Sequence, residues 1–321
     1  MNEFSFINSI KQISYKQPSL VKGIGDDAAV FRSEKDIVTA VDTFVEGIHF
    51  SRETMSPFQT GYRALAANIS DLAAMGARPA FYLVSVVIPK TWTLKEVEEI
   101  FSGMKELARY DHMDLIGGDT VSGSELSISI TVIGLVEKGM ARFRHTAQPG
   151  DHVFVTGTLG DARAGLHILT GKTSSYINSS YFVKRHQMPS PRSTFAVSLA
   201  GIDRVTLNDV SDGIGNEANE IAEASDVTIT LYDVNIPVSD DFQQFPPSFQ
   251  QEWKYFGGED FELLGTVAEE NWDALARIAN DTGTQLTKIG FVSEAEKEPS
   301  VYVIKDNRKT RLDKNGYTHL K

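Results

Sequence analysis

Short apolar runs that end in glycine and aspartate recur along this chain of 321 residues, and they limit the folds open to it. The runs are short and rich in β-branched residues, so they predict strands at residues 37–41, 81–88, 127–135, 153–156 and 227–232. Segments with apolar residues at helical spacing predict helices at residues 60–75, 94–109, 161–170, 213–224 and 272–280. This mixture predicts an α/β (α+β) fold.

Local patterns refine this picture. Residues 127–135 are expected to form a half-buried strand of an open sheet. Thr93 and Glu96 have the spacing of a capping box, which predicts a helix start at this point. Residues 171–190 and 238–250 have the weakest pattern and are expected to form loops.

The length predicts two domains, because a domain usually has about 100–200 residues. The turn-rich sequence TAQPGD at 146–151 precedes a new strand and marks the boundary. We therefore expect an N-terminal domain at 1–147 and a C-terminal domain at 148–321.

Composition excludes several classes of protein. The net charge of −12 argues against nucleic-acid binding, which normally needs a basic face. The chain has no cysteine, which excludes disulfides, thiol nucleophiles and Cys-ligated zinc. It also lacks a signal-peptide pattern and an apolar stretch of the ~20 residues that a membrane span needs. We expect a cytoplasmic protein with no nucleic-acid or membrane partner.

Carboxylates beside glycines or within apolar segments are the candidate functional groups of the first half. Asp27 lies in the sequence GIGDDAAV, and Asp42 follows a strand, where open α/β sheets place ligands. Asp71 lies within an apolar helix, where a carboxylate is costly unless it is paired or binds a metal. Asp119 follows two glycines that permit close approach of a ligand. The alternatives are a solvated turn for Asp27, an exposed helix position for Asp71 and a hairpin turn for Asp119.

Three further motifs occupy the second half. The glycine-rich loop in residues 155–165 leads into a helix, whose free N–H groups suit an anion, although a plain turn is equally consistent. Asp209, Ser211 and Asp212 supply more oxygen atoms at a helix start than an N-cap needs. Glu259 and Asp260 follow two glycines and could bind a cation or a hydrogen-bond donor of a substrate.

These carboxylates exceed what one ion needs, and several Mg²⁺ ions that bridge the phosphates of ATP would satisfy them. The sequence has neither a Walker A motif nor the H-R-D loop of protein kinases. A nucleotide would therefore be held through metals, backbone amides and a few basic groups such as Arg144.

The ordered set GIGDDAA, VDT with GIHF, NISDLAAMGARP, LIGGDT, VTGTLGD, DVSDGI and GGEDFEL resembles the thiamine-monophosphate kinase family. This family lies within the aminoimidazole-ribonucleotide-synthetase-like (PurM-like) superfamily, and the resemblance runs from about residue 4 to residue 320. It implies two PurM-like α/β domains, of which the first binds ATP and Mg²⁺ and forms a homodimer and the second completes the active site. It also implies transfer of the γ-phosphoryl group of ATP to thiamine monophosphate, which gives thiamine diphosphate.

The resemblance also assigns roles to residues. The implied magnesium ligands are Asp27, Asp42, Asp71, Asp119, Asp209 and Asp212. The implied ATP contacts are Tyr110, Gly118, Asp119, Arg144 and Ser211, and the implied substrate contacts are His49, Glu259 and Tyr317. The sequence departs from the family at Ala40 and Val41, where hydroxyl residues are common, so any side-chain ligand at those positions is absent.

The acceptor phosphate is largely dianionic at neutral pH, because its second pKa lies near 6. We therefore expect direct in-line transfer, without a strong general base and without a residue that acts as a covalent nucleophile. Two alternatives are another ATP-dependent enzyme of the superfamily and a non-catalytic protein that binds nucleotides or thiamine phosphates. Metal-dependent turnover of ATP would separate an enzyme from a binding protein.

Overall fold

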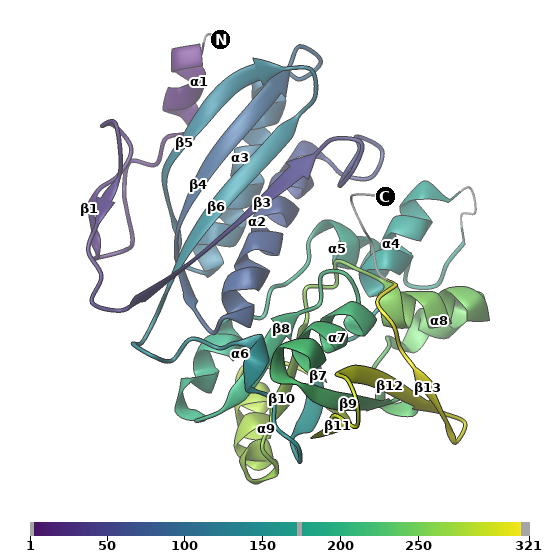
Figure 1. Cartoon of the computed structure of the whole chain (residues 1–321). Coiled ribbons are helices and arrows are strands. Elements are labelled where there is room, and N and C mark those ends of the chain that lie inside the picture. Colours follow the sequence, from purple (N-terminus) through teal and green to yellow (C-terminus); the bar gives the residue numbers. More distant parts are fainter. Residues whose placement is uncertain (1–2, 172–174, 316–321) are drawn as a thin grey trace. The chain divides into compact units, whose positions relative to one another are not determined.

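A computed structural model describes residues 3–171 and 175–315, and the chain divides into two compact units. The first unit comprises the residues up to Leu72 together with Ala77–Ala141, and the second comprises Ala73–Gly76 and the chain from Arg142 onward. Figure 1 shows both units as mixtures of helices and strands. In the part of the chain that the structure describes, no helix is both long and apolar enough to cross a membrane.

The first unit is built on a four-stranded sheet with helices on one face (Figure 1). The strands, in spatial order, are β3 (Asp36–Val45), β6 (Ser127–Val136), β4 (Arg78–Pro89) and β5 (Asp114–Gly123). Only β4 and β5 pair in parallel; the other pairs are antiparallel. The remaining elements of this unit are α1 (Glu3–Ile10), β1 (Leu20–Lys22), β2 (Val30–Phe31), α2 (Pro57–Ala74) and α3 (Leu94–Tyr110).

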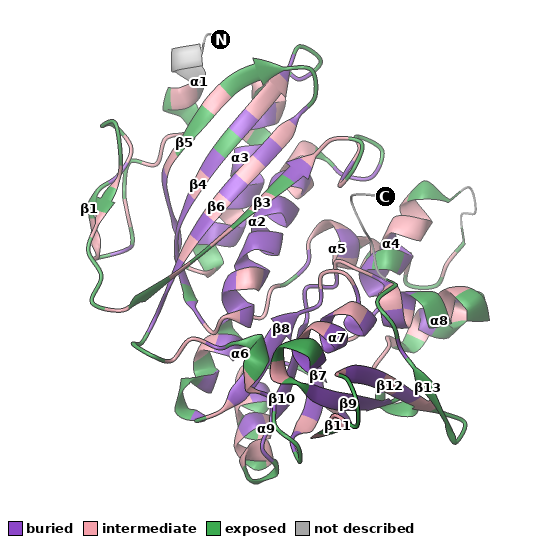
Figure 2. Ribbon diagram, in the orientation of Figure 1, coloured by how far each residue is buried: buried purple, intermediate pink, exposed green. Residues whose placement is uncertain are grey.

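The alternation of β6 separates the two faces of this sheet. Ile128, Ile130 and Val132 are buried, whereas Ser129 and Thr131 between them are partly exposed (Figure 2). The half-buried strand expected at 127–135 is therefore confirmed. We call the face that carries Ser129 and Thr131 the open face.

Helices α2 and α3 approach each other through glycines. An added Cβ atom would lie 1.8 Å from the Ile100 carbonyl oxygen at Gly61, and 1.9 Å from the Phe58 carbonyl oxygen at Gly103. Helix α3 begins with the expected capping box, in which Thr93 and Glu96 satisfy each other's backbone N–H groups.

The second unit has, within the described residues, a seven-stranded sheet covered on both faces. Its strand order is β13 (Arg308–Arg311), β12 (Ser300–Lys305), β9 (Val227–Tyr232), β11 (Leu286–Glu294), β7 (His152–Thr156), β10 (Leu263–Val267) and β8 (Val205–Asp209). Val153 and Val155 pack with α7 (Ile214–Ser225) in one core. Phe154 points the other way and packs with α6 (Ser193–Ser198) and α9 (Trp272–Asp281).

Most predicted elements are confirmed, but three details are wrong. Residues 171–190 contain the helix α5 (Ser179–Gln187), and residues 238–250 contain a 3-10 turn and the start of α8 (Pro247–Phe256). Their apolar residues pack with α4 (Asp161–Thr170) in an aromatic cluster that includes Phe182, Phe245 and Trp253, so tertiary packing forms these helices where the local pattern is weak. Strand β5 also continues through the Gly-Gly pair to Gly123, so the alternative of a hairpin turn before Asp119 is wrong.

The glycine contact between α2 and α3 gives a direct test. We expect Gly103→Ala to lower the free energy of unfolding by about 2 kcal/mol, because the Cβ atom overlaps a backbone oxygen and the helices must separate. Urea unfolding measures the change. Gly201→Ala is the matched control, since an added Cβ there meets no atom within 4 Å. Equal stabilities of the two variants would contradict the close packing.

Candidate functional site

Asp42 and Asp71 lie on the helix-covered side of the first unit. The Asp42 backbone N–H donates to Oδ1 of Asn68 on α2 at 3.1 Å. Asp71 lies three residues after Asn68, so the two share one side of this helix. Burial raises the pKa of Asp42 above its usual value, and the nearby His49 opposes that rise. These two carboxylates are therefore held near one end of the helical layer.

His49 is fixed beside the end of β3. Its Nδ1 atom accepts the Val45 backbone N–H at 3.0 Å, and its ring stacks on Phe44 with 5.0 Å between ring centroids. Because Nδ1 accepts this bond, Nε2 is the ring nitrogen that faces other partners.

Asp119 and Asp27 lie elsewhere in this unit. Asp119 pairs in register with Ser85, whose β6 neighbour Ser129 bonds to Thr43 at 2.7 Å between hydroxyl oxygens. Asp119 is therefore exposed on the open face, and Asp27 is exposed between β1 and β2. Among the described residues, no three acids or histidines lie close enough together to hold a metal ion.

The implied ATP contacts of the first unit are also exposed. The ring of Tyr110 ends α3 with 64% of the residue exposed, and the Arg109 guanidinium lies 5.1 Å from its centroid. Gly118 lies in the exposed part of β5, directly before Asp119.

In the second unit, Asp209, Ser211 and Asp212 occupy the turn between β8 and α7. Asp209 is the last residue of β8 and is buried, whereas Ser211 and Asp212 are half-buried. Helix α7 begins at Ile214 after Gly213, without a side-chain capping bond. Ser211 and Asp212 are therefore not N-caps, so helix capping does not explain the oxygen-rich side chains of this motif.

Glu217, which the motifs did not single out, joins this turn from inside α7. Its carboxylate accepts hydrogen bonds from the Asp212 N–H at 3.1 Å, the Ser211 hydroxyl at 3.3 Å and the Asn208 amide at 2.6 Å. Burial, reinforced by the charge of Asp209, raises the pKa of Glu217 to about 8. The sequence signal that could have revealed Glu217 is an acidic residue at a buried position of α7.

Asn208 extends the connection to Arg144. Its Oδ1 accepts the Arg144 Nε–H at 2.9 Å, and another guanidinium nitrogen of Arg144 lies 3.0 Å from Glu220. Arg144 and Ser211, two implied ATP contacts, are thus linked through Asn208 and Glu217.

Residues 257–262, here called the acidic segment, bond directly to this turn. The N–H of Glu259 donates to the Ser211 carbonyl at 2.7 Å, and the Phe261 N–H donates to the Val210 carbonyl at 3.1 Å. A Cβ atom at Gly258 would lie 2.5 Å from the Ser211 carbonyl oxygen, so only glycine permits this approach. Glu259 therefore lies beside the turn that carries the implied metal ligands.

Asp260 does not serve as the expected ligand group. It is fully buried, and its carboxylate accepts the backbone N–H groups of Gly160 at 2.6 Å and Ala162 at 3.0 Å. The acidic group at the start of α4 is thus Asp260 itself, whose pKa burial raises to about 7, and it occupies the N–H groups that the glycine-rich loop was expected to offer. Tyr317 lies outside the described residues.

Although no ready-made metal site is formed among the described residues, acidic side chains gather near the turn after β8. Asp209, Asp212 and Glu220 crowd negative charge around Glu217, and this crowding contributes to the raised pKa of Glu217. A divalent cation bound by these oxygen atoms would relieve the repulsion, and oxygen ligands are those that Mg²⁺ prefers.

The raised pKa of Glu217 predicts how stability depends on pH. The ordinary value is 4.5 and the folded value is about 8, so the native protein retains a proton that the unfolded chain loses. For EDTA-treated protein, we expect the contribution of Glu217 to fall as the pH rises from about 4.5 to 8, and then to level off. Urea unfolding at several pH values should show a flatter dependence for Glu217→Gln. Glu223→Gln, at an exposed position of the same helix, should keep the original slope.

Comparisons with known proteins identify the family of the chain. Residues 25–136 match the family "AIR synthase related protein, N-terminal domain", and residues 148–303 match "AIR synthase related protein, C-terminal domain". The chain is 45% identical to the thiamine-monophosphate kinase of Bacillus subtilis (strain 168), over 100% of both chains.

Solved structures agree as well. The thiamine-monophosphate kinase of Stenotrophomonas maltophilia K279a is 33% identical, with a TM-score of 0.85 over 97% of this chain and 98% of that one. The structure described as "AaThiL complexed with AMPPCP and TMP" is 30% identical, with a TM-score of 0.78 over 93% and 92% of the two chains. The resemblance drawn from the motifs is therefore confirmed, and the chain belongs to the thiamine-monophosphate kinase family, whose members are kinases with a two-domain PurM-like fold.

Proposed function

We propose that this kinase transfers the γ-phosphoryl group of ATP to thiamine monophosphate, which gives thiamine diphosphate. The reaction would serve the biosynthesis of thiamine diphosphate in the cytoplasm. The observation that carries the proposal is the hydrogen-bonded contact between the acidic segment and the turn that follows β8. This contact puts Glu259, the implied substrate contact, beside Ser211 and Asp212, the implied contacts for ATP and metal. The related structure with AMPPCP and TMP supports the same pair of substrates.

Mg²⁺ is part of the proposal. Its ligands would be Asp27, Asp42, Asp71, Asp119, Asp209 and Asp212. When bound, the ions would neutralise phosphate oxygens and align donor and acceptor for in-line transfer. The need is electrostatic, since two unit charges ~4 Å apart repel by about 4 kcal/mol at an effective dielectric constant of 20, and several charges meet in this reaction.

The side chains of the protein would bind ATP and thiamine monophosphate and orient them for the transfer. Arg144, held by Asn208 and Glu220, would contact the phosphates of ATP, and the Ser211 hydroxyl would contact them from the turn. Tyr110, Gly118 and Asp119 are the further proposed ATP contacts. Glu259 carries a negative charge suited to the thiazolium cation, while His49 and Tyr317 complete the proposed substrate contacts. No residue needs to remove a proton from the acceptor, because the phosphate oxygen is already ionised.

A direct assay tests the reaction. Purified protein with Mg²⁺, ATP and thiamine monophosphate should yield thiamine diphosphate on chromatography, and EDTA should abolish the product because the aspartates hold ATP through metal ions. Free thiamine and aminoimidazole precursors serve as control acceptors. Turnover with another phosphorylated acceptor alone would refute the substrate, and ATP binding without any turnover would favour a non-catalytic binding protein.

A variant tests the metal role of Asp42 within the same assay. We expect Asp42→Ala to lose several kcal/mol of transition-state stabilisation, since one central ligand is removed. Asp36→Ala, at the exposed start of the same strand, is the matched control and should retain activity. Near-normal turnover of Asp42→Ala would refute its assigned role.

We also infer a homodimer formed through the open face of the first unit. Ile37 and Val41 are 52% and 61% exposed on β3, and Val121 is 48% exposed on β5. Between them lies the hydroxyl pair of Thr43 and Ser129. A second copy with the same surface would bury these apolar side chains, and isologous contacts of this kind are the commonest route to dimers.

The dimer predicts a change in mass. We expect Val41→Asp to convert the protein to a monomer in light scattering coupled to size exclusion, because a carboxylate would be buried against its symmetry mate. Val234→Asp, an equally apolar and 89% exposed position in the second unit, should leave the mass unchanged. A monomeric parent protein would refute the inference.

A further inference from the structure

The acidic segment holds an unfavourable backbone conformation around Glu259. Glu259 has φ 67° and Phe261 has φ 50°, which place two residues with side chains in the left-handed region. Such conformations persist only where the surroundings impose them, and they concentrate at functional sites.

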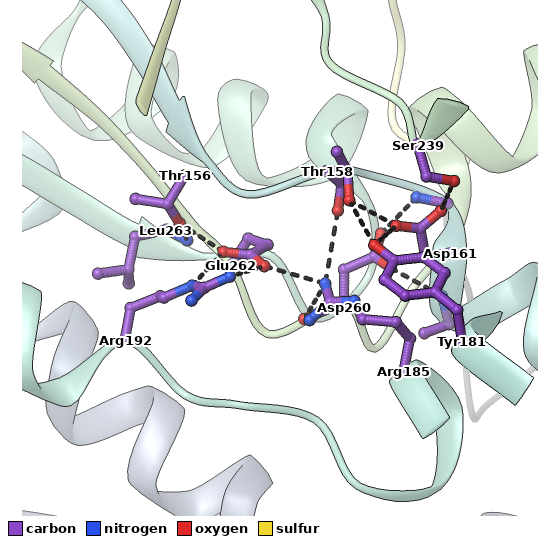
Figure 3. Close-up of polar contacts among 12 residues, drawn as sticks. Thr156, Thr158, Asp161, Tyr181, Arg185, Arg192, Ser239, Asp260, Glu262 and Leu263 are labelled. Carbon is purple, nitrogen blue, oxygen red and sulfur yellow. Dashed lines mark hydrogen bonds and ion pairs between the residues drawn. The ribbon is translucent and has the colours of Figure 1, made fainter. Parts of the chain in front are cut away.

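Glu262 is the first anchor of the segment. Its fully buried carboxylate accepts bonds from Arg192 Nε at 2.6 Å and Nη2 at 2.5 Å, from Arg185 Nη2 at 2.9 Å and from Thr156 Oγ1 at 2.7 Å (Figure 3). Burial opposes ionisation, but the two guanidinium groups outweigh it and keep the pKa of Glu262 below its usual value. Four directional bonds therefore fix one side chain at the end of the segment.

Asp260 is the second anchor. Its two carboxylate oxygens accept separate backbone N–H groups at the start of α4, so the side chain cannot rotate without losing one of them (Figure 3). Arg185 connects the two anchors, since its Nη2 atom also donates to the Asp260 carbonyl oxygen at 3.3 Å. The neighbouring Asp161 is fixed in turn by Tyr181 at 2.8 Å and Ser239 at 2.8 Å.

Glu259 differs from both anchors because it is half-exposed. Its backbone lies between Gly258, which packs on the Ser211 carbonyl, and the buried Asp260. Because the next side chain is fixed and the Glu259 N–H is bonded to Ser211, the backbone of Glu259 is held in one conformation, and this limits the directions open to its side chain.

A purely stabilising role explains this arrangement poorly. Apolar residues of similar volume often stabilise a fold as well as a buried ion pair does, whereas an ion pair fixes direction. Arg185 and Arg192 fix the orientation of the Glu262 side chain, directly after the left-handed residues Glu259 and Phe261.

We propose that Asp260 and Glu262, held by Arg185 and Arg192, are positioning residues that aim the Glu259 carboxylate at the substrate. The inference rests on the proposed function, in which Glu259 contacts thiamine monophosphate. None of the four residues is required to touch a substrate. They set substrate affinity through the backbone of the acidic segment.

The test compares two buried carboxylates of the same unit. Glu262→Gln removes the charge that both arginines bind. Asp151→Asn is the matched control, because Asp151 is also buried and pairs with Arg204, but it bonds to Thr266 near the opposite end of β10. Both variants should lower Tm, and each is assayed for KM and kcat toward thiamine monophosphate and ATP.

We expect Glu262→Gln to raise KM for thiamine monophosphate by tenfold or more, with KM for ATP and kcat changed less than threefold. Hydrogen exchange should also be at least tenfold faster at the Glu259 and Phe261 amides. Asp151→Asn should change neither the KM values nor these two amides. Arg192→Lys, which keeps one charged donor, should recover part of the affinity that Arg192→Met loses.

The outcomes separate the two proposals. Unchanged exchange at Glu259 and Phe261 in Glu262→Gln would overturn the positioning role, whatever the substrate is. Faster exchange with an unchanged KM, in a parent enzyme that does phosphorylate thiamine monophosphate, would overturn it as well. If the parent enzyme does not phosphorylate thiamine monophosphate, the proposed function fails, and the exchange measurement still decides whether the anchors hold the segment.

Discussion

The backbone hydrogen bonds between the acidic segment and the turn after β8 are the constraint on which the second unit's site depends. Three bonds join these stretches: Glu259 and Phe261 donate to the turn, and Val210 donates to the Glu262 carbonyl at 2.7 Å. Buried backbone groups must be paired, so neither stretch can move without leaving the other unsatisfied. The carboxylates of Asp209, Asp212 and Glu259 consequently behave as parts of one rigid surface.

The acidic residues around this surface differ in how their negative charge is compensated. Two arginines compensate the charge of Glu262 and keep its pKa below the usual value, whereas burial raises the pKa of Asp260 to about 7 in spite of the two backbone donors of α4. Glu217 has hydrogen-bond donors but also three acidic neighbours, so burial and charge raise its pKa to about 8. The second unit therefore confines excess negative charge to the turn after β8, where a cation is proposed to bind.

The sequence predicted five strands and five helices, all of which the structure contains, because their apolar periodicity is strong, as in residues 127–135 and 94–109. It did not predict other elements, such as β11, β12 and α6. It failed for α5 and α8, whose aromatic residues become informative only when α4 packs against them. The motif containing Asp209 and Ser211 was recognisable from its density of oxygen atoms. Asp260 was misassigned because adjacent acids look alike in a sequence, whereas their burial depends on the left-handed residues on either side of it.

Glu217 and Arg192 escaped notice for a related reason. Arg192 is 70 residues from the Glu262 carboxylate that it binds. Glu217 is close in sequence to Asp212, but its carboxylate reaches the Asp212 N–H only once the turn and the start of α7 have folded. By contrast, only the family resemblance assigns one metal-binding role to Asp27, Asp42, Asp71 and Asp119, since these residues lie at separate places in the first unit.

The capping of α4 by Asp260 has a consequence for how this fold can recognise anions. In many nucleotide-binding proteins, the loop between a strand and a helix offers its amides directly to phosphate. Here a side chain from almost a hundred residues away already occupies them. That strand-to-helix junction is thus closed to phosphate, so under the proposed function metal ions and separate basic groups would recognise the polyphosphate. With metals in that role, nucleotide affinity would follow the cation supply of the cell as much as the protein contacts.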